Sequence, residues 1–210
     1  MPRSRSKDLY GNAPDESPVA LLVIDMINGF EFPGAGKVLP RALEAARAIA
    51  ALSRRAREAA VPVVYVNDNF GKWRSDFRTL PEHCLKGEGG PIAELLRPRE
   101  DDYFVLKPRH SGFHSTTLEV LLAYLGTSTL VLTGVATNNC VLFTAHDAYM
   151  REFRLLVPRD CVASESEADD RYALEHMAKV LKADTELSAG IDLAALSRSC
   201  TGGTSLSSRS

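Results

Sequence analysis

Cys140 is the residue of this sequence whose type and position most clearly indicate chemistry. It ends the stretch Thr133-Gly-Val-Ala-Thr-Asn-Asn-Cys140, which follows the apolar run Thr129-Leu-Val-Leu132, so it lies where a strand turns into a helix. Unpaired N–H groups and the positive dipole end at a helix N-terminus stabilise a thiolate and lower its pKa from about 8.5. We therefore expect Cys140 to be a nucleophile. The alternative is a small apolar residue buried at the junction.

Two charged residues follow other apolar runs in the same way. Asp25 comes directly after Val19–Ile24, and Lys107 comes directly after Tyr103–Leu106 and before Pro108. In an open parallel sheet the carboxyl ends of the strands share one edge, and ligands bind in the crevice there. We expect the two charged side chains to converge with the cysteine at that edge. Taken singly, each charge also fits a solvated residue at a strand end.

Four ordered segments resemble those of the isochorismatase-like cysteine hydrolases, the superfamily that includes nicotinamidases and N-carbamoylsarcosine amidohydrolases. These segments are Val19–Phe30 (VALLVIDMINGF), Val63–Asp68 (VVYVND), Leu106–Thr116 (LKPRHSGFHST) and Leu132–Asp147 (LTGVATNNCVLFTAHD). The resemblance covers nearly the whole globular region. It implies an α/β fold, a three-layer α/β/α sandwich around a Rossmann-like parallel sheet of about six strands.

The resemblance also implies a role for each member of the triad Asp25, Lys107 and Cys140. Cys140 attacks a substrate carbonyl and becomes a thioester. Asp25 accepts the thiol proton, passes it to the leaving amine and later activates water. Lys107 holds the carboxylate in position and adds positive charge near the thiolate. In the family the peptide bond before Ala136 is cis, and the N–H groups of Ala136 and Cys140 form the oxyanion hole.

Departures from the family pattern restrict the substrate and the metal content. Many relatives read Met-Gln-Asn-Asp-Phe after the acid, whereas this chain reads Met26-Ile-Asn-Gly-Phe30 and lacks those polar groups. Nicotinamidases carry an aspartate and two histidines that bind a metal after the second strand. Here Asp68 is followed by no histidine before His83, and a zinc site needs three or four ligands. We expect no metal, no other cofactor and a substrate other than nicotinamide.

The loop after the second expected strand, Phe70–Phe77, holds the only tryptophan and two cations, and we expect it to border the pocket. Lys72, Arg74 and Arg109 are candidates to receive a substrate carboxylate, because a guanidinium matches one bidentately. Alternatively, Trp73 caps a local cluster while its cations lie in solvent or pair with an aspartate. The residues expected to line the substrate pocket are Phe30, Asn67, Trp73, Arg74, Arg109 and Thr137.

The histidines give weaker signals. His110 and His114 have helical spacing for a metal, but Gly112 between them disfavours a helix, so we expect a loop role. His146 follows Cys140 by six residues, on a different face of the expected helix, which disfavours a Cys–His dyad.

Composition agrees with a globular enzyme. The chain has 210 residues, 45% of them hydrophobic and 25% charged, as is usual for a globular domain. Its net charge of −2 lacks the positive excess that is typical of nucleic-acid-binding proteins. Glycines and polar residues interrupt the uncharged stretch Val120–Ala145, which argues against a membrane span. The basic start lacks the apolar segment of a secretory signal. The four cysteines lie far apart in the sequence, which is typical of reduced thiols and not of a disulfide framework. We therefore expect a cytoplasmic protein.

The order of apolar and amphipathic stretches predicts alternating strands and helices. Strands are expected at about 19–25, 62–67, 103–106, 129–133 and 153–157, with a short sixth strand at 185–187. Helices are expected at about 39–60, 115–125, 138–150 and 167–182. Alternation of this kind predicts a parallel sheet covered by helices on both faces. One domain is expected at 18–196, between mobile tails at 1–17 and 197–210.

The function that we expect is hydrolysis of a C–N bond in a small amide, carbamoyl or ureido substrate. One alternative is hydrolysis of a vinyl ether, as in isochorismatase, by acid catalysis that requires no thiol. Another is a noncatalytic member that binds a partner or senses oxidants through its cysteine. The presence of all three triad residues favours the amidase. The resemblance further implies a homodimer or homotetramer. The net charge and the interrupted uncharged stretch predict no nucleic-acid or membrane partner.

Overall fold

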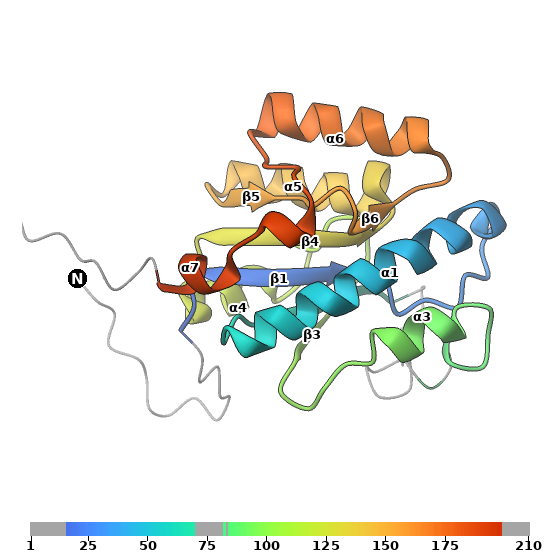
Figure 1. Ribbon diagram of the computed structural model, residues 1–210, viewed down its shortest axis with the longest axis horizontal. Coiled ribbons are helices and arrows are strands. Elements are labelled where there is room, and N and C mark those ends of the chain that lie inside the picture. Colours follow the sequence, from blue (N-terminus) through green and yellow to red (C-terminus); the bar gives the residue numbers. More distant parts are fainter. Residues whose placement is uncertain (1–15, 70–81, 83, 199–210) are drawn as a thin grey trace, which may run out of the picture.

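The sheet is the centre of the molecule (Figure 1). The structure is a computed structural model that describes residues 16–69, 82 and 84–198. All of its strand pairs are parallel, in the order β3-β2-β1-β4-β5, with β6 also paired to β4. The strands are β1 (Val19–Ile24), β2 (Val63–Asp68), β3 (Tyr103–Lys107), β4 (Thr129–Val135), β5 (Arg154–Leu156) and β6 (Val162–Ala163).

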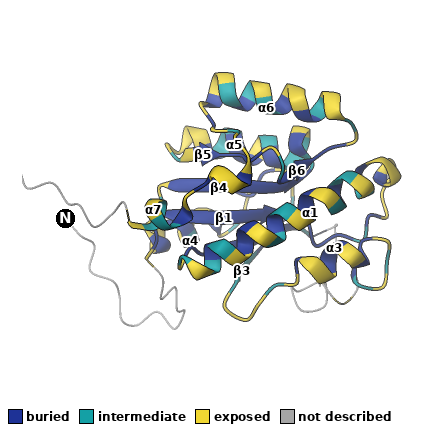
Figure 2. Cartoon of the chain, viewed as in Figure 1, coloured by how far each residue is buried: buried dark blue, intermediate teal, exposed yellow. Residues whose placement is uncertain are grey.

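Helices cover both faces of the sheet, which confirms the expected three-layer sandwich. The helices are α1 (Ala35–Glu58), α3 (Gly90–Leu95), α4 (Leu118–Leu125), α5 (Leu142–Met150), α6 (Glu167–Leu181) and α7 (Leu193–Arg198), with a π-helical turn η1 (Thr137–Val141) and a 3-10 turn η2 (Ser188–Gly190). Side chains alternate along β1: Leu21 and Val23 pack with α1, α3 and α7, whereas Leu22 and Ile24 pack with α4, α5 and α6. The two central strands, β1 and β4, are buried along their whole length (Figure 2).

The five main strands lie within about two residues of their expected positions. The predicted position of the sixth strand was wrong. The segment 185–187 forms no strand: Asp184 makes a single bridge to Leu156, and the sixth strand is β6. The N–H of Glu186 donates to the Asp184 carboxylate, an Asx-type turn that withdraws this N–H from the ladder. The expected tails lie almost wholly outside the described residues. Within the described ranges, no helix is long and apolar enough to cross a membrane.

Gly134 brings β4 against the end of β1. It lies opposite Ile24 in the pairing of the two strands, with φ of 114°. A Cβ at this position would lie 2.0 Å from the carbonyl oxygen of Ile24. Only glycine permits this approach, and Ile24 directly precedes Asp25 in the triad.

Gly134→Ala should therefore lower the free energy of unfolding by more than about 4 kcal/mol, because backbone must move to admit the methyl group. Gly126→Ala is the matched control: Gly126 also has a positive φ, of 70°, but a Cβ there meets no atom within 4 Å. The control should lose only about 1–2 kcal/mol, the cost of the left-handed conformation. Urea unfolding followed by circular dichroism measures both, and equal losses would contradict the close-approach explanation.

Candidate active site

The carboxyl edge of the sheet brings the three members of the triad together. Asp25 follows β1, Lys107 ends β3, and Cys140 lies in η1, just after β4. The Lys107 Nζ lies 2.8 Å from Asp25 Oδ2 and donates to the Cys140 Sγ at 3.5 Å. The thiol in turn hydrogen-bonds to the Asp25 carboxylate. The structure thus places an acid, an ammonium and a thiol in mutual contact, as the strand-end pattern predicted.

Backbone groups of β2 hold both the main chain and the carboxylate of Asp25. Its φ is 53°, a left-handed conformation that aspartate tolerates better than most residues. Its N–H donates to the carbonyl of Val66, and its Oδ1 accepts from the N–H of Asp68 at 2.7 Å. The second oxygen, Oδ2, therefore remains for Lys107. The Asp25 side chain is 7% exposed, so its carboxylate meets its partners largely without water.

Asp68 is a second carboxylate beside the ammonium, and the sequence reasoning did not assign it to this site. Its Oδ2 lies 3.6 Å from the Nζ of Lys107, whose side chain is completely buried. The sequence alone indicates only a poor zinc ligand at Asp68. It is the last residue of β2, so the strand-end argument that selected Asp25 and Lys107 applied to it equally.

Cys140 lies on a turn that is fixed from several directions. The turn η1 is π-helical, a form that is frequent at functional sites. The Thr144 hydroxyl donates to the carbonyl of Cys140 at 2.7 Å and accepts from the N–H of Gly112 at 3.0 Å. The Ser164 hydroxyl donates to Oδ1 of Asn138 and accepts from its N–H. The turn that carries Cys140 is therefore linked both to the lysine segment and to the loop after β6.

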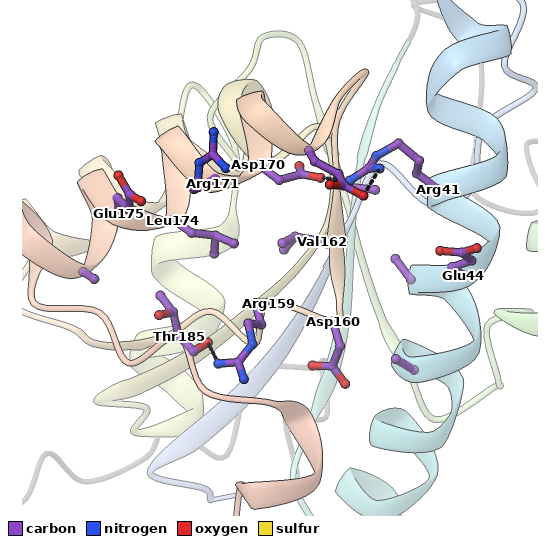
Figure 3. Close-up of a pocket in the computed structure, with 15 residues that line it drawn as sticks. Arg41, Glu44, Arg159, Asp160, Val162, Asp170, Arg171, Leu174, Glu175 and Thr185 are labelled. Carbon is purple, nitrogen blue, oxygen red and sulfur yellow. Dashed lines mark hydrogen bonds and ion pairs between the residues drawn. The ribbon is translucent and has the colours of Figure 1, made fainter.

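The start of the same turn is held by α6 and α1. Thr137 is fully buried, and its hydroxyl donates to Asp170 Oδ1 at 2.5 Å. Arg41 pairs with the other oxygen of Asp170 at 2.6 Å. Figure 3 shows Arg41 and Asp170 meeting across a groove of about 640 Å³ between α1 and α6. No triad residue lines this groove, and nothing in the sequence pattern had indicated Asp170.

The peptide bond between Val135 and Ala136 is cis, as the resemblance implied. It lies between the end of β4 and the turn that carries Cys140. The carbonyl of Ala136 accepts from the N–H groups of Asn139 and Val141, at 3.0 and 3.2 Å. The oxyanion-hole roles of the Ala136 and Cys140 N–H groups stay a prediction.

The thiol is not activated in the way that the sequence suggested. Burial, and then the negative charge of Asp25, raise the pKa of Cys140 to about 12. Lys107 lowers it, but by less. Burial also raises the pKa of Asp25, against the influence of Lys107. Burial alone lowers the pKa of Lys107, but Asp25, Cys140 and Asp68 together outweigh burial and raise this pKa, which keeps the ammonium charged. The expectation of a lowered thiol pKa was therefore wrong, because it considered the helix and the lysine without burial and the carboxylate.

The structure does not bring every expected pocket residue to the triad. Asn67 is fully buried on the opposite face of β2 from Asp68 and donates to the carbonyl of Ile27. Phe30 is buried against Phe32, and the Thr137 hydroxyl is engaged by α6. Arg109 is exposed, two residues beyond β3. Their substrate contacts remain predictions. Lys72, Trp73 and Arg74 lie outside the described residues.

Metal binding at this edge was not expected. Within residues 16–69, 82 and 84–198, no group of three or more His, Cys, Asp or Glu side chains is arranged to hold a metal ion. Asp68, the one candidate ligand from the nicotinamidase comparison, faces the Lys107 ammonium. An ammonium at this distance competes with a cation for the carboxylate. The absence of a metal from the site stays a prediction.

Asp25→Asn should make Cys140 more reactive toward alkylation. The substitution removes the charge that raises the thiol pKa and leaves Lys107 in place, so more thiolate forms at a given pH. We expect iodoacetamide to react at pH 8 roughly three- to tenfold faster for each unit by which the pKa falls. Mass spectrometry of the Cys140 peptide measures the rate across pH. Glu175→Gln, at an exposed carboxylate on α6, is the control. An unchanged profile in Asp25→Asn would show that this charge does not govern the thiol.

Lys107→Met should destabilise the fold strongly, because it leaves two carboxylates at the sheet edge without their cation. At pH 8 we expect a loss of about 3–5 kcal/mol in the free energy of unfolding. Lys37→Met removes an exposed pair with Glu165, at 3.5 Å, and should cost at most about 1 kcal/mol. Denaturant unfolding compares the two variants. Similar small losses in both would contradict a structural role for the buried ammonium.

Comparisons with known proteins identify the family of this chain. Residues 19–185 match the family model of the isochorismatase domain. The chain is 40% identical over 165 residues to the uncharacterized isochorismatase family protein YaaI of Bacillus subtilis (strain 168), covering 79% of this chain and 91% of YaaI. It is 32% identical over 178 residues to the maleamate amidohydrolase of Pseudomonas putida, and the match covers 80% of this chain and 79% of that protein. The structure of the N-carbamoylsarcosine amidase from Thermoplasma acidophilum matches with a TM-score of 0.66 and 30% identity, over 83% of this chain and 98% of that one. The chain therefore belongs to the isochorismatase family of hydrolases.

Proposed function

We propose that the chain hydrolyses a C–N bond of a small amide, carbamoyl or ureido compound through a thioester on Cys140. The observation that carries this proposal is the mutual contact of the triad, with Lys107 Nζ 2.8 Å from Asp25 and 3.5 Å from the Cys140 sulfur. Two of the similar proteins support the bond type, since their names are maleamate amidohydrolase and N-carbamoylsarcosine amidase.

The raised pKa values indicate how the first half of the reaction proceeds. Because the thiol is protonated in the free protein, its proton must pass to Asp25 as the sulfur attacks the substrate carbonyl. The buried carboxyl accepts this proton readily, since its own pKa is raised. The oxyanion that forms is held by the N–H groups of Ala136 and Cys140. Asp25 then protonates the leaving nitrogen, the C–N bond breaks, and a thioester remains.

The second half releases the acid. Asp25, again a carboxylate, removes a proton from a water molecule that attacks the thioester carbonyl. The C–S bond breaks, and the thiol recovers the proton from Asp25. Lys107 remains charged throughout, which keeps the carboxylate in place and offsets negative charge on sulfur. No metal ion is required for any of these steps.

The same thiol pKa weighs against the noncatalytic alternative. Oxidant-sensing cysteines have low pKa values and expose a thiolate. Cys140 has a pKa of about 12 and is only partly exposed. A binding-only role also leaves the contacts of Cys140 with Asp25 and Lys107 without a chemical use. We further propose the homodimer or homotetramer that the resemblance implies, which light scattering on the purified chain measures.

Ammonia release from a panel of primary amides, N-carbamoyl amino acids and ureido acids tests the reaction. We expect turnover of at least one class, survival of that turnover after chelation, and a loss of at least about 10³-fold in Cys140→Ala. Cys161→Ala, at a buried cysteine outside the triad, is the control and should retain activity. Turnover that persists in Cys140→Ala would contradict the thioester. A chain that leaves the panel intact but cleaves a vinyl ether would favour the isochorismatase-type reaction.

A further inference from the structure

Two histidines outside the triad face each other between α5 and α6. The Nε2 atoms of His146 and His176 lie 3.1 Å apart, and their ring centroids are separated by 5.1 Å. Both side chains are partly exposed, so solvent and small ions reach them. His146 is thus paired with α6 and not with Cys140, in agreement with the helix-face argument against a Cys–His dyad.

The pair carries the lone pairs that a metal ion needs. A hydrogen bond between two imidazole nitrogens requires that at least one ring be neutral, because a protonated imidazole has only donors. Neutral imidazole, with one nitrogen lone pair free, is the form that ligates metals.

The separation of the two nitrogens fits a shared metal ion. For metal–nitrogen bonds of about 2.05 Å, two nitrogens 3.1 Å apart subtend an angle of about 98° at the ion. This angle lies between the 90° of octahedral and the 109° of tetrahedral coordination, so the separation of the two nitrogens is one that a single ion can span. We propose that His146 and His176 form a binding site for one divalent transition-metal ion of the Zn²⁺, Ni²⁺ or Cu²⁺ type, which imidazole ligands favour.

Water completes the coordination at this site. Among the described residues, no third His, Cys, Asp or Glu joins the pair in a metal-binding group. The site is therefore weaker than a structural zinc site with four protein ligands. Because the ion bridges two helices of the folded chain, it stabilises the native state by an amount that grows with the ratio of the free ion concentration to Kd. One of these helices, α5, continues directly from η1, so the ion ties the nucleophile-bearing segment to α6. The inference does not depend on the proposed reaction.

Titration of the full-length chain with Ni²⁺ at pH 7.5, followed by calorimetry, tests the site. Thiols are alkylated beforehand so that cysteines cannot bind the ion. We expect one ion per chain, and at least about tenfold weaker binding in either His146→Ala or His176→Ala, because each removes one of two protein ligands. The double variant His110→Ala/His114→Ala removes two exposed histidines with no role in the pair and should bind as the wild type does.

A second measurement identifies the ligands. Electron paramagnetic resonance of the Cu²⁺-loaded, alkylated chain should show coupling to two imidazole nitrogens, reduced to one in each single variant. Circular dichroism of the metal-free variants checks that both are folded. The inference is overturned by the absence of saturable binding, by binding that survives unchanged in both single variants, or by a Cu²⁺ spectrum without two coupled imidazoles.

Discussion

The ammonium of Lys107 is the constraint on which the carboxyl edge of the sheet depends. It is completely buried, so it is tolerated only because carboxylates lie next to it. Asp25 and Asp68 supply those charges from the ends of β1 and β2. The parallel register places Asp68 opposite Lys107 and Ile24 opposite Val66, so three strands must end together for the cluster to form. Gly134 allows β4 to lie close to the end of β1, so that the turn after β4 places Cys140 beside Asp25 and Lys107.

In the proposed reaction, this cluster explains how a partly buried thiol could serve as a nucleophile without being a thiolate at rest. Two carboxylates and one ammonium already carry a net negative charge, so ionising Cys140 as well would add a further uncompensated charge in a poorly solvated site. The thiol therefore keeps its proton until a substrate carbonyl can accept the sulfur. Its neighbour Asp25 has the raised proton affinity needed to receive it. Reactivity is thereby restricted to bound substrate, which suits a hydrolase better than a sensor.

Much of the framework could be predicted because apolar runs mark buried strands and each of the triad residues closely follows such a run. The same reasoning failed where an outcome depends on tertiary contacts. The segment after Asp184 has strand-like composition, yet a local Asx turn ends the pairing after one bridge. Asp170 supports Thr137 from a helix 33 residues away, a relation that no local pattern encodes. The direction of the Cys140 pKa shift reversed because burial outweighs the helix dipole and the lysine, and burial is known only once the chain is folded.

Trapping of the covalent intermediate tests the central claim most directly. The chain is mixed with an amide that it turns over, quenched in acid within the first turnovers, and analysed by intact-protein and peptide mass spectrometry. The thioester mechanism predicts a mass increase equal to the acyl group on the peptide that contains Cys140, removable by hydroxylamine and absent when Cys140 is replaced by alanine. Turnover without any adduct on that peptide, at a rate that the Cys140→Ala variant matches, would contradict it.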